Sequence, residues 1–302
     1  MTYLTGGERA GLLAAIAGFA LFSLGDAITK TMIGEWSPVA VAATRFALGA
    51  LFLGTLLAVR EGRSAFIPAH PWLQMVRGLA LAVGTIYFFS AVFVMPLTSA
   101  IAIAFAAPAI TALLSGPILG EKVRPLTWIA IASAFTGVLV ALQTGLLNLG
   151  WPALLPLGTA FGMSTLVICN RASAGKDSVL SMQFFMTAGA ALLLVPASFI
   201  ATETGIAVLA LEWPSWNVLA RCVAITVTGT LGHALVYFGT TRAGAAHVAP
   251  ATYVQLITAS LLGWALFGNI PEPVTMLGAA IIVAAGLILW WDGRVLASMR
   301  QR

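Results

Sequence analysis

The sequence predicts an all-α membrane protein of ten transmembrane helices, arranged as two inverted repeats of five, with both termini in the cytoplasm. Composition indicates the class, because 60% of the 302 residues are hydrophobic and 8% are charged, against about 25% charged residues in soluble proteins. Long apolar stretches also alternate with short segments of Gly, Pro and charged residues. Finally, the two halves of the chain resemble one another.

The apolar stretches are long enough to cross a bilayer. A helical span takes about 20 apolar residues, since every backbone amide must find its partner inside the helix. The segments that meet this length are 10–30, 39–59, 72–94, 98–118, 126–144, 150–169, 179–200, 217–240, 244–267 and 274–291. The first segment is longer than the apolar core of a signal peptide, so we expect it to be retained as a membrane helix.

Basic residues indicate on which side the termini lie. An even number of spans places both termini on one side, and of the 15 Lys and Arg residues only Lys30, Arg45 and Arg221 fall toward the other side. Because positive residues accumulate in cytoplasmic loops, we expect cytoplasmic termini. All nine Trp residues fall near predicted span ends, as residues of a membrane interface do.

Several functional classes lack their signatures in this sequence. The net charge of +5 includes no run of three basic residues, which argues against a nucleic-acid partner. Cys169 and Cys222 fall on different spans without metal-ligand spacing, so we expect neither a metal site nor a disulfide. We find no catalytic motif and no cofactor-binding motif. Without a nucleotide-binding segment, the chain cannot use ATP itself.

The two halves align over their fourth and fifth helices. MPLTSAIAIAFAAPAITALLSGPILGEK aligns with RAGAAHVAPATYVQLITASLLGWALFGN, because each begins at a very short connection and runs through an Ala-rich helix to a Gly-containing turn. An odd number of helices per repeat makes the second repeat enter the membrane from the opposite side. Inverted repeats are typical of transporters, with the substrate site near the midplane. We expect repeats at 1–148 (helices 1 to 5) and 149–302 (helices 6 to 10), together forming one transport domain.

These features resemble the drug/metabolite transporter superfamily, EamA type. The resemblance is carried by loosely spaced motifs of the first half, namely Asp26-Ala-Ile-Thr-Lys30, Pro108, the turn Gly120-Glu121-Lys122 and Gly137. The second half departs from the pattern, with Gln255 where the proline would recur and Asn269 near the place of the glutamate. The resemblance implies a ten-helix carrier of the bacterial inner membrane, and it extends to the aromatic amino-acid exporters of that group.

The eighth predicted helix carries a polar stripe. Thr226, Thr230, His233, Tyr237 and Thr241 follow at spacings of three or four residues, which places them on one helix face. Because lipid cannot satisfy these groups, we expect the stripe to face the bundle interior or a water-filled cavity. The alternative is that the threonines bond to carbonyls of their own helix and that His233 has a packing role.

Further candidates for substrate binding lie on the third and ninth helices. Tyr87, Tyr237 and Tyr253 are three of the four tyrosines, and uncharged aromatic walls suit a solute with a flat apolar body. Gln255 can donate and accept hydrogen bonds near mid-span, or it can join helices. The resemblance implies a pocket between helices 3, 4, 8 and 9, with contributions from helices 1 and 6. The expected substrate-binding residues are Tyr87, Thr230, His233, Tyr237, Tyr253 and Gln255.

Asp26 and Lys30 are the candidates for ion coupling. Asp26 is the only carboxylate well inside a predicted span, where a charge costs about 2.5 to 3.5 kcal/mol. Lys30 lies one turn further along and can pair with Asp26 while its side chain reaches the outer interface, so a structural pair is the default. Arg45 and Arg77 also lie inside spans, where they either meet substrate carboxylates or snorkel to the interface.

The combined prediction is a secondary transporter that exports small organic metabolites, most favourably amino acids including aromatic ones, by alternating access. One alternative is export of cationic drugs or quaternary ammonium compounds, for which only Asp26 supplies a negative charge. Another is a non-transporting membrane assembly module. We expect a small-molecule substrate and the lipid bilayer as partners, with no cofactor, nucleic acid or ATPase subunit required. The sequence does not decide between a monomer and a homodimer.

Overall fold

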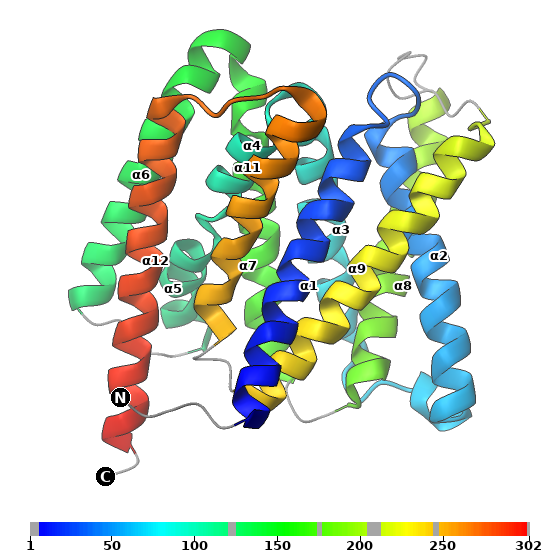
Figure 1. The fold of residues 1–302 in the computed structure, drawn as a ribbon. Coiled ribbons are helices and arrows are strands. Elements are labelled where there is room, and N and C mark those ends of the chain that lie inside the picture. Colours follow the sequence, from blue (N-terminus) through cyan, green and yellow to red (C-terminus); the bar gives the residue numbers. More distant parts are fainter. Residues whose placement is uncertain (1–5, 120–124, 174–176, 204–212, 244–247, 301–302) are drawn as a thin grey trace.

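The computed structural model describes residues 6–119, 125–173, 177–203, 213–243 and 248–300. Within these residues the chain is helical, contains no β-strand, and has ten helical segments long and apolar enough to cross a membrane. The predicted class of an all-α, ten-span membrane protein is confirmed. The start of α1 and the end of α12 lie at the same end of the bundle, as Figure 1 shows; we call this end the terminal end.

The long helices agree with the predicted spans within a few residues at most ends. They are α1 (Gly6–Lys30), α2 (Pro38–Arg60), α3 (Pro71–Val94), α6 (Pro125–Leu149), α8 (Val179–Glu203), α9 (Trp216–Ala243) and α12 (Pro273–Arg300). A single turn of 3-10 helix, η1 (Arg63–Phe66), follows α2. The start of α2 has the expected chemistry, because the Ser37 hydroxyl accepts a hydrogen bond from the Ala40 amide at 3.1 Å and Pro38 occupies the first turn.

Three predicted spans are each built from two helical pieces. The fourth consists of α4 (Leu97–Ala104) and α5 (Ala107–Leu119), the sixth of η2 (Trp151–Leu154) and α7 (Leu155–Ser173), and the ninth of η4 (Ala249–Tyr253) and α11 (Val254–Phe267). The Gly120-Glu121-Lys122 turn lies outside the described residues. Apolar length therefore predicted the spans but not their breaks.

The main helix contacts join the two halves of the chain. Helix α1 packs against α9, α2 against α8, α3 against α7 and α6 against α12 (Figure 1). Small residues permit the closest approaches: a Cβ on Gly78 of α3 would lie 2.7 Å from the Gly189 Cα of α8, and one on Gly18 of α1 would lie 2.8 Å from the Gly232 oxygen of α9. The main hydrophobic core consequently includes buried residues from both halves.

Lys30 does not pair with Asp26. Its buried ammonium donates hydrogen bonds to the carbonyl oxygens of Val92 at 3.2 Å and Met95 at 2.5 Å, at the C-terminal end of α3. Helix carbonyls at that end have no partners within the helix and carry the negative end of the helix dipole, so a cation is stabilised there. Lys30 thus joins the end of α1 to the end of α3, and it does not reach outward as the sequence suggested.

Arg77 is also held inside the protein and does not snorkel. Its side chain is 3% exposed and donates hydrogen bonds to Asn170 Oδ1 at 2.7 Å, Gln74 Oε1 at 2.5 Å and the Met182 oxygen at 3.2 Å. These acceptors lie on α7, α3 and α8. Arg77 therefore links three helices, and its guanidinium is engaged by protein acceptors.

The end of the bundle opposite the terminal end has an ion pair between α9 and the α1–α2 connection. Arg221 of α9 pairs with Glu35 and donates to the Thr31 oxygen at 2.9 Å. The hydrogen bond from Arg221 is the main cause that holds the pKa of Glu35 below its ordinary value, and the positive charge of Arg221 acts in the same direction. These contacts join α1 and α9 at this end.

Candidate functional site

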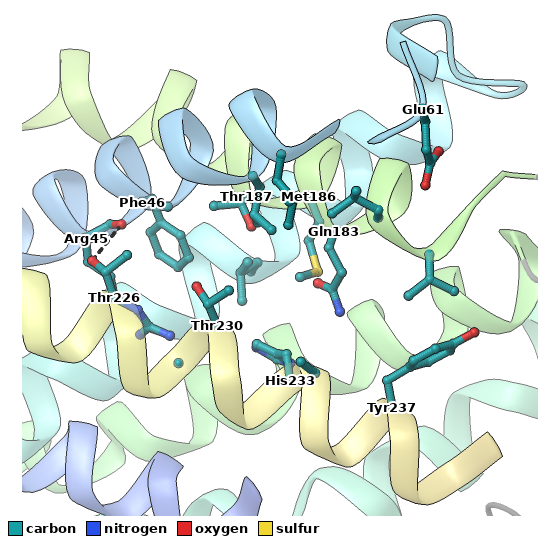
Figure 2. A pocket seen from close by; sticks show the side chains of 18 residues that line it. Arg45, Phe46, Glu61, Gln183, Met186, Thr187, Thr226, Thr230, His233 and Tyr237 are labelled. Carbon is teal, nitrogen blue, oxygen red and sulfur yellow. Dashed lines mark hydrogen bonds between the residues drawn. The ribbon is translucent and has the colours of Figure 1, made fainter. Parts of the chain in front are cut away.

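A cavity of about 470 Å³ lies between α2, α8 and α9, with Leu81 of α3 at its wall (Figure 2). It begins at Arg45, about two turns after the start of α2, and extends to Glu61 just after the end of α2 and Val179 at the start of α8. The end of α2 lies at the terminal end of the bundle (Figure 1). The cavity therefore runs from inside the second span to the terminal end.

Most polar side chains of this cavity lack a hydrogen-bond partner among the described residues. Thr226 is engaged, since its hydroxyl donates to the Cys222 oxygen at 2.8 Å and lies 3.3 Å from the Arg45 oxygen. Six other polar side chains line the cavity and make no hydrogen bond or ion pair with another described residue: Arg45, Gln183, Thr187, Thr230, His233 and Tyr237. Because buried polar groups are normally satisfied, such a set indicates a space occupied by water or a polar ligand.

The predicted stripe on α9 faces this cavity over most of its length. Thr226, Thr230, His233 and Tyr237 all contribute to the wall, and Figure 2 shows them along one side of α9. Thr241 does not contribute, because its hydroxyl donates to the Phe238 oxygen of its own helix at 3.0 Å. The His233 ring also packs edge-on against Phe22 of α1, with centroids 4.8 Å apart. His233 thus has both a packing contact and a free polar edge at the cavity.

Arg45 is held at the inner end of the cavity by apolar contacts. Its guanidinium lies over the rings of Phe46, at 5.0 Å from the centroid, and Phe89, at 5.7 Å. Glycine at position 229 provides the space, because a Cβ there would approach Arg45 Nη2 to 2.9 Å. The guanidinium is therefore positioned by contacts that do not use its hydrogen-bond donors.

Asp26 lies behind Arg45, on the side away from the main cavity. A recess of about 20 Å³ separates them, with walls from α1, α2 and α9. The Asp26 carboxylate accepts a hydrogen bond from Gln255 Nε2 at 3.2 Å. The backbone carbonyl oxygen of Gln255 accepts a second hydrogen bond, from the Ser23 hydroxyl, at 2.7 Å. Gln255 therefore joins α11 to α1, which is the alternative role considered for it, and it is not part of the cavity wall.

The structure does not place Tyr87 and Tyr253 at the cavity. The Tyr87 ring of α3 lies over Gly158 of α7, where no side chain would fit. Tyr253 packs edge-on against Phe105, with centroids 5.5 Å apart, and its hydroxyl lies over Gly286. Of the expected substrate-binding residues, only Thr230, His233 and Tyr237 meet in one place, and the cavity is formed by the second, seventh and eighth spans.

The match to a known family agrees with this architecture. The EamA-like transporter family model matches residues 9–143 and again residues 150–291. The chain belongs to the EamA-like transporter family. This confirms the resemblance seen in the sequence and identifies the protein as a membrane transporter of the drug/metabolite type.

This EamA-like chain is similar to transporters whose named solutes differ. It is 30% identical to a riboflavin transporter of Rhizobium johnstonii, covering 91% of this chain and 88% of that protein. It is 26% identical to an S-adenosylmethionine uptake transporter of Rickettsia prowazekii, over 88% and 87%. It is 22% identical to the pseudopaline exporter CntI of Pseudomonas aeruginosa, over 93% and 96%. Both uptake and export occur among these relatives.

The likeness to a solved structure supports only the fold of this EamA-like chain. One crystal structure matches with a TM-score of 0.60 at 18% sequence identity, covering 95% of this chain and 99% of that chain. At this identity the match says nothing about solute or direction. It does show that the helical arrangement occurs over the full length of another protein.

Sequence reasoning missed the α8 wall of the cavity in this EamA-like chain. Gln183, Met186 and Thr187 come from α8, a span that supplied none of the expected substrate-binding residues. A signal was present, because Gln183 and Thr187 are four residues apart and so share a helix face. Arg45 had been recognised as able to meet a substrate carboxylate, but nothing in its own helix indicated that it would lack a protein partner.

Proposed function

We propose that this chain is a secondary transporter that moves a small organic metabolite across the bacterial inner membrane by alternating access, with the α2/α8/α9 cavity as its binding site. The observation that carries the proposal is the set of six cavity-lining polar side chains without a described protein partner. Inside a membrane span an unsatisfied polar group costs several kcal/mol, on the order of a lost hydrogen bond or more. A cavity that binds hydrated solutes explains why these polar groups are present in spite of that cost.

Two features support alternating access. The family model matches twice along the chain, and the main helix contacts run between the halves, as two inverted repeats at 1–148 and 149–302 require. The cavity extends to the terminal end, while the Arg221–Glu35 pair and the Lys30 contacts join helices at the other end. With cytoplasmic termini, as the basic residues predict, this arrangement corresponds to a state open to the cytoplasm.

The cavity suits a solute with a flat apolar body and polar substituents. Phe46, Met186 and Tyr237 supply apolar surface, and Gln183 and His233 supply hydrogen-bonding groups from opposite helices (Figure 2). Export of amino acids, including aromatic ones, is the narrower proposal that follows from this surface. The named solutes of the relatives, riboflavin and S-adenosylmethionine, are alternatives that the same experiment must include.

The cavity weighs against export of cationic drugs. Its inner end carries the guanidinium of Arg45, which repels a cation. Asp26, the carboxylate that this alternative needs, lies behind Arg45 and is hydrogen-bonded to Gln255. A non-transporting assembly module is weighed against as well, because such a protein gains nothing from six polar groups facing an open space.

Asp26 remains the candidate for proton coupling, and Lys30 does not share that role because it binds the end of α3. Asp26 has a single described hydrogen-bond donor, Gln255, and lies within electrostatic reach of Arg45. Protonation of its carboxylate would therefore change the charge beside the binding site. We expect Asp26→Asn to lose the acceleration of flux by an imposed pH gradient while exchange of solute between the two sides persists.

The experiment is flux in proteoliposomes containing the purified full-length protein. The panel contains phenylalanine, tryptophan, riboflavin, S-adenosylmethionine and tetraphenylphosphonium, each with and without a pH gradient. We expect saturable flux of at least one non-cationic solute, reduced about twofold to tenfold by Gln183→Leu, because a hydrogen bond to the solute is worth about 0.5 to 1.5 kcal/mol. Thr241→Val is the matched control, because Thr241 is engaged with its own helix. The proposal is contradicted if the folded protein transports no solute of the panel, or if it transports only tetraphenylphosphonium.

A further inference from the structure

We propose that Arg45 binds an anionic group of the carboxylate class on the transported solute, so that the transporter selects solutes carrying such a group. This inference rests on the proposed transport function and specifies the substrate class of the same site. It begins from one contrast among the basic side chains inside the described spans. Lys30 and Arg77 satisfy their donors with protein oxygens, whereas the Arg45 side chain makes no hydrogen bond or ion pair with any described residue.

The surroundings of Arg45 hold its guanidinium in place while leaving its donors unused. Phe46 and Phe89 lie against it, and Gly229 makes room for one terminal nitrogen on α9. A guanidinium presents N–H groups in a planar fork that matches the two oxygens of a carboxylate. A charged group taken from water needs such a counter-ion, because desolvation without one is costly.

Neighbouring groups complete a site for an anion. The Thr230 hydroxyl and the His233 imidazole line the same inner part of the cavity from α9, and neither has a described hydrogen-bond partner. Both can donate a hydrogen bond to a carboxylate oxygen. Three donors from two helices thus face the end of the cavity that is furthest from its opening.

Asp26 balances part of the charge of Arg45 without occupying its donors. The two side chains interact electrostatically across the recess of about 20 Å³, a space with room for about one water molecule. The Asp26 carboxylate is instead hydrogen-bonded by Gln255. Arg45 is therefore tolerated in the empty transporter, and its fork remains available to a solute.

The apolar wall next to Arg45 defines the rest of the solute. Phe46 lies against it, Met186 lines the same cavity, and Tyr237, 44% exposed, lies further toward the opening. A carboxylate at Arg45 consequently places an attached apolar body against these side chains. The chemical class that fits is a carboxylate with a compact apolar or aromatic substituent.

Matched pairs of carboxylate and amide test this inference. Phenylalanine with phenylalaninamide, and indole-3-propionate with its amide, compete against the transported panel solute in proteoliposomes with the full-length protein. We expect each carboxylate to compete about tenfold to a hundredfold better than its amide, the range for one charge-assisted hydrogen-bonded contact. Arg45→Met should reduce this ratio to about one, and Arg45→Lys should retain part of it.

Two further variants separate the inference from an effect on folding. Gly229→Ala keeps Arg45 but displaces its guanidinium, because the new Cβ would approach Nη2 to 2.9 Å; we expect the ratio to fall while the thermal unfolding temperature changes little. Arg221→Met removes a cation at the opposite end of the bundle and should leave the ratio unchanged.

The outcomes distinguish this inference from the proposed function. Riboflavin has no carboxylate. If riboflavin is transported and carboxylates compete no better than their amides, the role of Arg45 is overturned, whereas the proposed transport function is supported. A preference that survives in folded Arg45→Met also overturns it. Absence of flux for every solute overturns the proposed function and, with it, this inference.

Discussion

The Gln255 side chain of α11 donates a hydrogen bond to the Asp26 carboxylate of α1 at 3.2 Å, across 229 residues of sequence. Gln255 follows directly on the junction where η4 ends and α11 begins, and its own carbonyl accepts a hydrogen bond from Ser23 of α1. The start of α11 is thus anchored twice to α1. Asp26 and Gln255 therefore have a structural connection in addition to any role in coupling.

This connection predicts that Gln255→Ala destabilises the protein. Removing the amide leaves the Asp26 carboxylate without its described donor, and an unsatisfied buried group costs about 1 to 3 kcal/mol. We expect thermal unfolding in detergent to shift downward by several degrees, on the order of that loss. Gln255→Glu would place two carboxylates together and should be more damaging at neutral pH. An unchanged unfolding temperature in Gln255→Ala would show that the contact contributes nothing.

Tyr237 of α9 and Tyr87 of α3 should respond differently to truncation. Tyr237 is 44% exposed at the cavity, so Tyr237→Ala should lower solute flux with little change in thermal unfolding. The Tyr87 ring is 41% exposed but packs over Gly158, so Tyr87→Ala removes this helix contact and should cost about 1 kcal/mol of stability. Flux per folded molecule compared with unfolding temperature separates the two effects, and similar behaviour of both variants would contradict the assignment.

The approach of α3 to α8 predicts that Gly78 is sensitive to a single added methyl group. In Gly78→Ala the new Cβ would lie 2.7 Å from the Gly189 Cα, a backbone atom that cannot move aside by itself. Overpacking of this kind costs about 1 to 3 kcal/mol, which outweighs the better helix propensity of alanine. Gly7→Ala is the control, because nothing lies within 4 Å of its Cβ position. The measurement is the yield of monodisperse protein together with its thermal unfolding temperature.

Glu35 predicts a pH dependence at the end opposite the termini. Arg221 lowers the pKa of Glu35 in the folded protein, so the pair stabilises the fold above the unfolded pKa and loses this effect as pH falls through the folded pKa. Wild type and Glu35→Gln should therefore differ by a constant, small amount at neutral pH and converge below about pH 4, the ordinary range for Glu. Thermal unfolding of both proteins across pH 3 to 8 tests this, and convergence near neutral pH would contradict it.

The sequence by itself determined the number, the position and most boundaries of the membrane spans, because apolar length and the Gly, Pro and charge punctuation are local properties of the chain. It also determined which face of α9 is polar, because residues three and four positions apart lie on the same face of a helix. The family followed from the same features together with loosely spaced motifs.

Only the tertiary structure decided which polar groups are satisfied and which remain open to solute. Lys30 had a suitable carboxylate one turn away, yet it bonds to carbonyls at the end of α3. Tyr87 and Tyr237 are both expected substrate-binding residues, but only Tyr237 lines the cavity. The Arg77 guanidinium is bonded by Gln74 of its own helix and by groups of α7 and α8, whereas no described residue accepts a hydrogen bond from the Arg45 guanidinium. The physical reason is that a span's hydropathy depends on its own residues, whereas most hydrogen-bond partners of a polar side chain are supplied by other helices that packing brings beside it.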